Sequence, residues 1–310
     1  MATNLNLDQW RQGLPEIVRS CAADWSLRVG TPFAPGAGGF AAPVERADGS
    51  TAVLKVVLPH RESEHEADAL DVWDGEGAVG LLERDQARHA LLVERCEPGT
   101  PLSKARREDP LQVVADLLPR LWKPATTPFR SLSTEAAWWT SYLERRWEEF
   151  SRPFERRLLD AALEFLTELP ATQGQQVLVH QDLHGDNVLA AAREPWLVID
   201  PKPLTGEREF ALAPIVRSSE LGHSPHAIRR RLDRLSGDLG LDRERARCWR
   251  RWARPSPGCS TPRTSRTTPR QHGGCSTCSQ HTSGTASKLV RRIPPTDLAL
   301  RVRPRLRDTG

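Results

Sequence analysis

Acidic and amide side chains gather between residues 180 and 200, and their spacing suits one kind of chemistry. His180 and Asp182 are followed by Asn187, and Asp200 ends the apolar run that comes next. Kinases use this order, an H-x-D-x-x-x-x-N loop followed by a strand-borne aspartate, for phosphoryl transfer. In that chemistry Asp182 orients the acceptor hydroxyl and takes its proton, while Asn187 and Asp200 offer oxygen ligands to Mg²⁺. Single loop aspartates are ordinary surface residues, so the prediction depends on the whole pattern.

A lysine suited to holding phosphate groups lies far upstream, in the middle of an apolar strand. The hairpin-turn signal Asp48-Gly49 precedes residues 51–58, which read as a strand with Lys55 at its centre. A lysine in a strand is by itself more often a solvated edge residue. Its place before the 180–200 stretch is what favours a functional role.

The elements expected around these residues divide the chain into two lobes. Residues 1–96 combine a first helix with short strands, and residues 97–248 are dominated by helical periodicity interrupted by three short apolar runs. The break Cys96-Glu-Pro-Gly99 separates the two parts as a linker would. We therefore predict an α+β fold with a small β-rich N-lobe and a larger, mainly helical C-lobe.

The amino-acid sequence of residues 180–203 also resembles that of a known family. The segments His180-Gln-Asp-Leu-His-Gly-Asp-Asn-Val-Leu189 and Arg193-Glu-Pro-Trp-Leu-Val-Ile-Asp-Pro-Lys-Pro203 resemble aminoglycoside phosphotransferases, within them the streptomycin and hydroxyurea phosphotransferase branch. The resemblance covers about residues 10–248. It implies a bilobal protein-kinase-like fold that uses ATP and Mg²⁺ to phosphorylate a hydroxyl group of a small molecule, such as streptomycin.

The resemblance assigns further roles in nucleotide binding. Lys55 resembles the lysine that holds the α- and β-phosphates, and a helix over residues 62–73 would supply the glutamate that orients it. Glu66 is our choice for that glutamate, with Glu62 and Glu64 as alternatives.

Other features are expected around the site. The linker at Glu94 and Cys96 would meet adenine through its backbone, and a glycine run at 36–39 would cover the phosphates. His180 and His184 are expected to be structural parts of the catalytic loop. The pair Trp138-Trp139 either walls the acceptor pocket or belongs to the core, as aromatic pairs in helices more often do.

One position departs from the family pattern. Family members carry an aspartate in the helix that follows the metal aspartate, and this chain has Ala211 there. In kinase-like folds that aspartate braces the backbone of the catalytic loop, so its absence predicts a looser site. A catalytically impaired or dead kinase-fold protein is therefore the alternative reading.

The C-terminal part of the sequence, residues 249–310, is rich in Arg, Pro, Ser and Thr and lacks helical periodicity. Low complexity of this kind is typical of a disordered tail. Our hypothesis is instead a frameshift near residues 248–254. When G/C-rich codons are written for residues 253–262 and 271–281 and both segments are read in the same offset frame, each one encodes an amphipathic helix.

Bulk properties exclude several other classes of protein. The 310 residues include 38% hydrophobic and 27% charged residues, and the net charge of +4 arises from the basic C-terminal part. Without aromatic interleaving, that part does not favour nucleic-acid binding. The six cysteines form no regular framework, and the pair Cys275 and Cys278 lacks a second ligand pair for zinc. With no signal-like or membrane-spanning segment, we expect a cytoplasmic protein of unknown oligomeric state.

Overall fold

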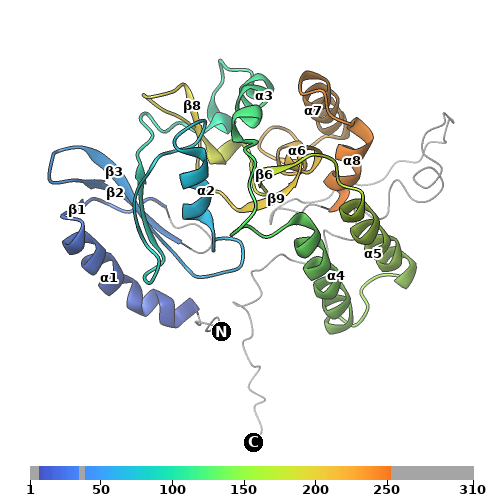
Figure 1. Cartoon of the computed structure of the whole chain (residues 1–310), viewed down its shortest axis with the longest axis horizontal. Coiled ribbons are helices and arrows are strands. Elements are labelled where there is room, and N and C mark those ends of the chain that lie inside the picture. Colours follow the sequence, from blue (N-terminus) through green and yellow to red (C-terminus); the bar gives the residue numbers. More distant parts are fainter. Residues whose placement is uncertain (1–6, 35–38, 253–310) are drawn as a thin grey trace, which may run out of the picture.

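The computed structural model describes residues 7–34 and 39–252, which form two lobes joined by a linker near Cys96 (Figure 1). The smaller lobe holds a five-stranded sheet of order β1-β2-β3-β5-β4, and every neighbouring pair in it is antiparallel. The predicted α+β arrangement of a β-rich N-lobe and a helical C-lobe is confirmed. The strands of this sheet are β1 (Arg28–Val29), β2 (Gly39–Glu45), β3 (Thr51–Val57), β4 (Leu81–Asp85) and β5 (Ala90–Glu94).

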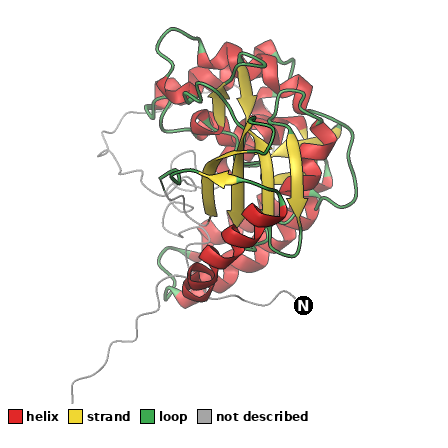
Figure 2. Cartoon of the chain, turned by 90° about the vertical axis from the view of Figure 1, so that its left-hand side faces the viewer, coloured by secondary structure: helices red, strands yellow, loops and turns green. Residues whose placement is uncertain are grey.

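The alternation of side chains along β3 and β5 separates two apolar cores. Leu54, Val56 and Leu92 face a core completed by α1 (Leu7–Asp24), which lies across the outer face of the sheet (Figure 2). Val93, on the opposite face of β5, joins the core shared with the C-lobe. Because successive side chains of a strand point to opposite faces, the central lysine of β3 must also face the C-lobe.

Helix α2 (Glu66–Trp73) lies between the sheet and the C-lobe (Figure 1). It begins later than the helix expected over residues 62–73, because the side chain of His60 organises the preceding residues as turns. Its Nδ1 accepts the backbone N–H groups of Glu62 at 3.1 Å and Ser63 at 3.2 Å. At the other end the buried Trp73 donates its indole N–H to the carbonyl of Leu121 at 2.9 Å, which ties α2 to the C-lobe.

The C-lobe surrounds two short antiparallel ladders with helices. The helices are α3 (Pro110–Leu121), α4 (Leu132–Glu149), α5 (Arg156–Ala171), α6 (Arg208–Arg217), α7 (Pro225–Asp238) and α8 (Arg243–Trp252), with short 3₁₀ turns η1 (Leu102–Lys104) and η2 (Gly185–Asn187). Three of these helices start at a side-chain cap: Asp109 accepts the N–H of Leu111 before α3, Ser131 accepts that of Thr134 before α4, and Ser224 accepts that of Ala227 before α7. The ladders pair β6 (Gln176–His180) with β9 (Pro203–Glu207), and β7 (Val188–Ala190) with β8 (Trp196–Val198).

Strand β9 carries no sequence signal of its own, since proline and glycine are poor strand residues. Tertiary packing explains its glycine. A side chain at Gly206 would meet Leu132 at 2.9 Å, so β9 approaches the start of α4 as closely as a bare backbone allows. The strand is buried along its whole length.

The last described helix belongs to the C-lobe and continues past the boundary expected at residue 248. Trp249 is completely buried in α8, and its indole N–H donates to Glu207. The same carboxylate accepts from Arg245 at 2.5 Å and from the backbone of Gly174 at 3.0 Å. The predictions for residues 253–310, including the zinc alternative and the offset frame, lie outside the described residues.

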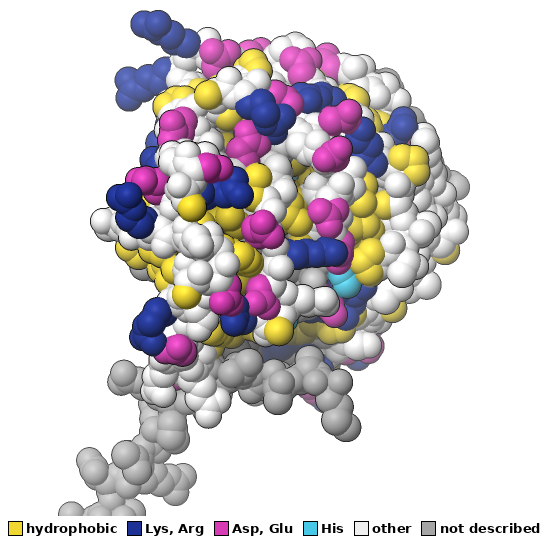
Figure 3. Space-filling view, turned by 60° about the vertical axis from the view of Figure 1, so that its left-hand side comes forward, with side chains coloured by type: hydrophobic (Ala, Val, Ile, Leu, Met, Phe, Trp, Pro, Cys, Tyr) yellow, Lys and Arg dark blue, Asp and Glu magenta, His cyan; other side chains and the backbone are white. Residues whose placement is uncertain are grey.

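The surface mixes charges of both signs. On the face drawn in Figure 3, Lys and Arg side chains are interspersed with Asp and Glu side chains, and hydrophobic side chains are exposed between them. Among the described residues, no helix combines the length and apolar character needed to span a bilayer.

Candidate active site

The loop between β6 and β7 is held in place by a buried histidine. His180, the last residue of β6, accepts the backbone N–H of Asp182 on Nδ1 at 3.1 Å and bonds the carbonyl of Ile199 through Nε2 at 3.2 Å. Because an amide only donates and a carbonyl only accepts, both bonds require the neutral ring. Burial lowers the pKa of His180 to about 4, which keeps the ring neutral near pH 7.

Asp182 presents its carboxylate at the edge of this loop. The side chain is 38% exposed and bonds the ammonium group of Lys202. Its backbone carbonyl accepts the side-chain amide of Asn187 at 3.0 Å, which links two of the predicted site residues directly. Lys202 lies within the segment that resembles the family, but its residue type and spacing predicted no role for it. Lys202 lies four residues after the end of β8, and only the fold of this segment brings its ammonium group to Asp182.

Asp200 follows β8 in a left-handed backbone conformation, with φ at 54°. This turn redirects the chain so that the Asp200 carboxylate meets Lys55, 145 residues earlier in the sequence. The neighbouring N–H of Ile199 donates to the backbone carbonyl of Asn187 at 3.0 Å, so the Asn187 and Asp200 segments lie side by side. Partial loss of hydration opposes ionisation of Asp200, but the charge of Lys55 outweighs it and holds the pKa below its ordinary value.

Lys55 reaches a second carboxylate on α2. Its Nζ lies 2.5 Å from Glu66, whose side chain is 5% exposed. Of the two alternatives, Glu64 instead pairs with Arg130 at 3.0 Å, and Glu62 lies in the turns before α2. The structure therefore brings Lys55, Glu66 and Asp200 together.

Two carboxylates thus flank a single ammonium group. Loss of hydration lowers the pKa of Lys55, but the charges of Glu66 and Asp200 outweigh it and raise the pKa above its ordinary value. Burial raises the pKa of Glu66 to about 7 against the attraction of Lys55, and repulsion from Asp200 adds to the rise. At neutral pH Lys55 is protonated and Asp200 is ionised, while Glu66 lies close to the midpoint of its titration, so any ionised Glu66 gives the group excess negative charge, which suits a site for a cation.

The side chains of Asn187 and Asp200 each offer an oxygen atom of the kind that Mg²⁺ binds. The amide nitrogen of Asn187 is engaged by the Asp182 carbonyl, so its oxygen is the atom left to act as a ligand. The Asp200 side chain is 44% exposed and bonds Lys55 through one oxygen. Two protein oxygens are enough for Mg²⁺ when phosphates and water complete its shell. No cluster of three or more His, Cys, Asp or Glu with metal-binding geometry occurs in the described part of the chain.

The linker residues Glu94 and Cys96 offer backbone groups. The Glu94 carboxylate accepts the N–H of Gly80 at 2.9 Å and two bonds from Arg193, at 2.9 and 2.8 Å, so it is fully engaged in structure. The backbone N–H of Cys96 has no hydrogen-bond partner among the described residues. Burial raises the pKa of the Cys96 thiol to about 12, which leaves it protonated and unreactive. Of the glycine run, Gly39 begins β2 and residues 35–38 are outside the described part.

This chain has Ala211 where the family has an aspartate, and a different side chain, that of Glu220, bonds the backbone of the loop between β6 and β7. Ala211 is 2% exposed on α6, among other buried residues. The N–H of Gly185 in the catalytic loop donates at 2.8 Å to Glu220, which also accepts from the hydroxyl of Ser218. Glu220 follows α6 in an irregular segment, and no sequence pattern identified it.

The two tryptophans of the pair have different neighbours. Trp139 packs against Phe210 with ring centroids 6.1 Å apart and borders the core. Trp138 stacks on Tyr142 at 5.0 Å and lies against the guanidinium group of Arg61.

Comparison with known sequences gives consistent matches. Residues 25–260 match the family described as aminoglycoside/hydroxyurea antibiotic resistance kinase. A hydroxyurea phosphotransferase of Kitasatospora aureofaciens is 42% identical over 77% of this chain and 70% of its own length. A streptomycin 6-kinase of Streptomyces griseus is 36% identical over 77% of this chain and 80% of its own length.

Solved structures with a similar fold include kinases of small molecules. The choline kinase LicA of Streptococcus pneumoniae aligns over 77% of this chain and 86% of its own, with a TM-score of 0.58 and 14% identity. A spectinomycin phosphotransferase in complex with ADP and spectinomycin aligns over 77% of this chain and 83% of its own, with a TM-score of 0.51 and 12% identity. These likenesses confirm the predicted kinase-like fold.

Proposed function

This chain belongs to the aminoglycoside/hydroxyurea antibiotic resistance kinase family, and from that membership we propose that it transfers the γ-phosphoryl group of ATP to a hydroxyl group of an aminoglycoside such as streptomycin. One observation carries the proposal for this chain. Asp182, Asn187 and Asp200 come together with the Lys55 and Glu66 pair, although these residues span 145 positions of the sequence.

We assign Asp182 to the acceptor side of the reaction. Its carboxylate is accessible and stands at the end of a loop that His180 holds rigid. In this role it accepts a hydrogen bond from the acceptor hydroxyl and takes its proton as the oxygen–phosphorus bond forms. Lys202 now bonds this carboxylate, and a bound acceptor would share or replace that contact.

Lys55, Glu66, Asn187 and Asp200 serve the nucleotide side. Lys55 would bind the α- and β-phosphates, and Glu66 keeps the ammonium group in place. Mg²⁺, when bound, neutralises charge on the phosphates, and Asn187 and Asp200 would hold it. The free backbone N–H of Cys96 supports a hydrogen bond to adenine from the linker.

The acceptor is tested with purified full-length protein, Mg-ATP and a panel containing streptomycin, spectinomycin and hydroxyurea. Phosphorylation of streptomycin is expected, and hydroxyurea is the second candidate because a hydroxyurea phosphotransferase is 42% identical. An Asp200→Asn variant is expected to lose Mg-ATP binding, measured by calorimetry without any acceptor. If no acceptor is phosphorylated while Mg-ATP binds normally, the impaired-kinase alternative replaces the proposal.

A further inference from the structure

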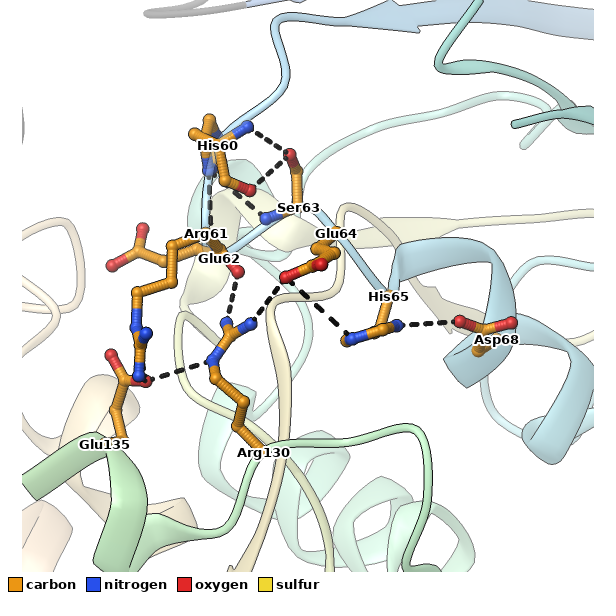
Figure 4. A network of polar contacts seen from close by, with 9 residues as sticks. All are labelled: His60, Arg61, Glu62, Ser63, Glu64, His65, Asp68, Arg130 and Glu135. Atoms are coloured by element: carbon orange, nitrogen blue, oxygen red, sulfur yellow. Dashed lines mark hydrogen bonds and ion pairs between the residues drawn. The ribbon is translucent and has the colours of Figure 1, made fainter. Parts of the chain in front are cut away.

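A partly buried polar network connects the two lobes away from the catalytic loop. It joins residues 60–65, between β3 and α2, to residues 130–135 at the start of α4 (Figure 4). Arg130 lies at its centre and bonds Glu135, Glu64 and the backbone carbonyl of Arg61. The roles assigned to the site residues above do not use this network.

Glu135 is the buried anchor of the network. Its side chain has no exposed surface, and one of its oxygens receives Arg61 at 2.8 and 3.0 Å and Arg130 at 3.2 Å. A buried carboxylate needs such partners, because an unpaired charge is costly away from water. The guanidinium group of Arg61 is further confined by the ring of Trp138, 5.2 Å away. The arginines of the two lobes are thus held at a common point.

The network lies immediately before the helix that carries Glu66. Residues 60–65 form turns, so side-chain contacts rather than a helical ladder set their path. Arg61 and Glu64 belong to that segment and both contact the C-lobe through the network. The segment that leads into α2 is therefore joined to the C-lobe through Arg130 and Glu135.

On the other side the network continues to the catalytic loop. The carbonyl of Arg130 accepts the N–H of Thr205 in β9 at 2.9 Å. β9 starts directly after Lys202 and pairs with β6, the strand that ends at His180. One connected set of contacts thus runs from Glu66 to the segment that holds Asp182.

We propose that Glu135 is a positioning residue: by holding Arg61 and Arg130 together it fixes the start of α2, and so keeps Glu66 beside Lys55. This inference rests on the proposed function, in which that ion pair serves the nucleotide. Glu135 itself acts through the arginines and takes no part in the chemical step.

The test compares Glu135→Gln with Glu148→Gln in the full-length protein. Glu148 is a matched control because it lies on the same helix and pairs with Arg152 at 3.1 Å, but both side chains are exposed. Hydrogen exchange over residues 60–73 should accelerate in Glu135→Gln, with exchange in α5, α7 and α8 unchanged. The Kd and KM for Mg-ATP should rise roughly tenfold, because a small displacement of a positioned group is costly. The control should match the wild type in all of these measurements.

A double variant separates positioning from a general loss of stability. If Glu135 acts through Glu66, Glu135→Gln should cause little further loss of Mg-ATP affinity in a Glu66→Gln background. Losses that multiply would overturn the proposal, as would unchanged exchange over residues 60–73 or a uniform acceleration across the C-lobe. If Glu135→Gln does not fold, Arg61→Met takes its place, since that side chain is 32% exposed and its removal leaves the Glu135 and Arg130 pair intact.

The exchange and binding measurements need no acceptor. A wild-type protein that phosphorylates nothing would therefore contradict the proposed function. The exchange measurements would still show whether the position of α2 depends on Glu135.

Discussion

At the scale of single residues, the site depends on groups whose neighbours set their protonation and direction. The Asp182 side chain is 38% exposed and can meet a substrate, whereas His180 is buried and fixed by two bonds to the backbone. The two residues are separated by one position, yet the first is expected to act in chemistry and the second in structure. The predictions at this scale follow from that difference.

Replacing Asp182 by Asn should reduce kcat by about 100-fold to 10,000-fold, the usual contribution of a general base. The Kd for Mg-ATP should change little, because the residue is assigned to the acceptor and not to the phosphates. Steady-state kinetics and calorimetry measure the two quantities. Asp186→Asn, in the same loop and bonded to Ser103, is the control and should lose much less activity. Near-normal turnover in Asp182→Asn would remove this residue from the mechanism.

The neutral His180 should make stability depend on pH. Its pKa is about 4 when folded and 6.5 in the reference state, so between these values the unfolded chain binds a proton that the folded chain does not. The free energy of unfolding should therefore rise with pH across this window, by about 3 kcal/mol relative to a His180→Gln variant. Urea titrations of both proteins from pH 4 to pH 7 measure the difference. Parallel curves would show that His180 is not buried neutral.

At the scale of elements, α6 and the segment after it decide how the catalytic loop is braced. The amides of Asp182 and Gly185 already have acceptors in His180 and Glu220. An aspartate at position 211 would find neither amide free, and its charge would be buried. We therefore expect Glu220 to brace this loop in place of the family aspartate.

We expect Ala211→Asp to lower the free energy of unfolding by at least about 2 kcal/mol without raising activity, because a buried unsatisfied charge is costly.

Glu220→Ala should leave the fold intact but lower kcat roughly tenfold by loosening the loop at Gly185. Thermal unfolding and initial rates test both variants. An Ala211→Asp protein that is more stable and more active would show that the family brace is missing after all.

At the scale of the whole molecule, α8 closes the C-lobe as part of its core. Trp249 contacts the ring of Phe210, with centroids 5.3 Å apart, and donates to the buried Glu207. This contact joins the end of the described chain to β9 and α6, the elements beside the catalytic loop. The C-lobe therefore includes residues that composition alone assigned to a separate segment.

Trp249→Ala should reduce the free energy of unfolding by about 3–5 kcal/mol, the usual cost of emptying a buried tryptophan site. Trp25→Ala, at a partly buried position just past α1, should cost clearly less. Chemical denaturation followed by circular dichroism measures both. Equal, small losses would mean that α8 is not packed as described.

The sequence by itself determined the kinase-like fold and the acidic loop, because that information is local. Asp182, Asn187 and Asp200 lie within twenty positions of one another, between short strands whose apolar residues can be read directly. The strand that carries Lys55 was equally legible from its turn and its composition. Their functional roles remain predictions that the variants above will test.

Only the tertiary structure decided which partners these residues have. From the sequence we chose Glu66 over Glu62 and Glu64, and the structure places Glu66 on α2 in contact with Lys55. Glu220 and β9 escaped prediction because their contacts come from segments that carry no periodic pattern. Glu135 meets Arg61 across 74 positions, and its burial makes that contact matter. Local patterns encode elements, whereas the pairing of charges depends on how distant elements pack together.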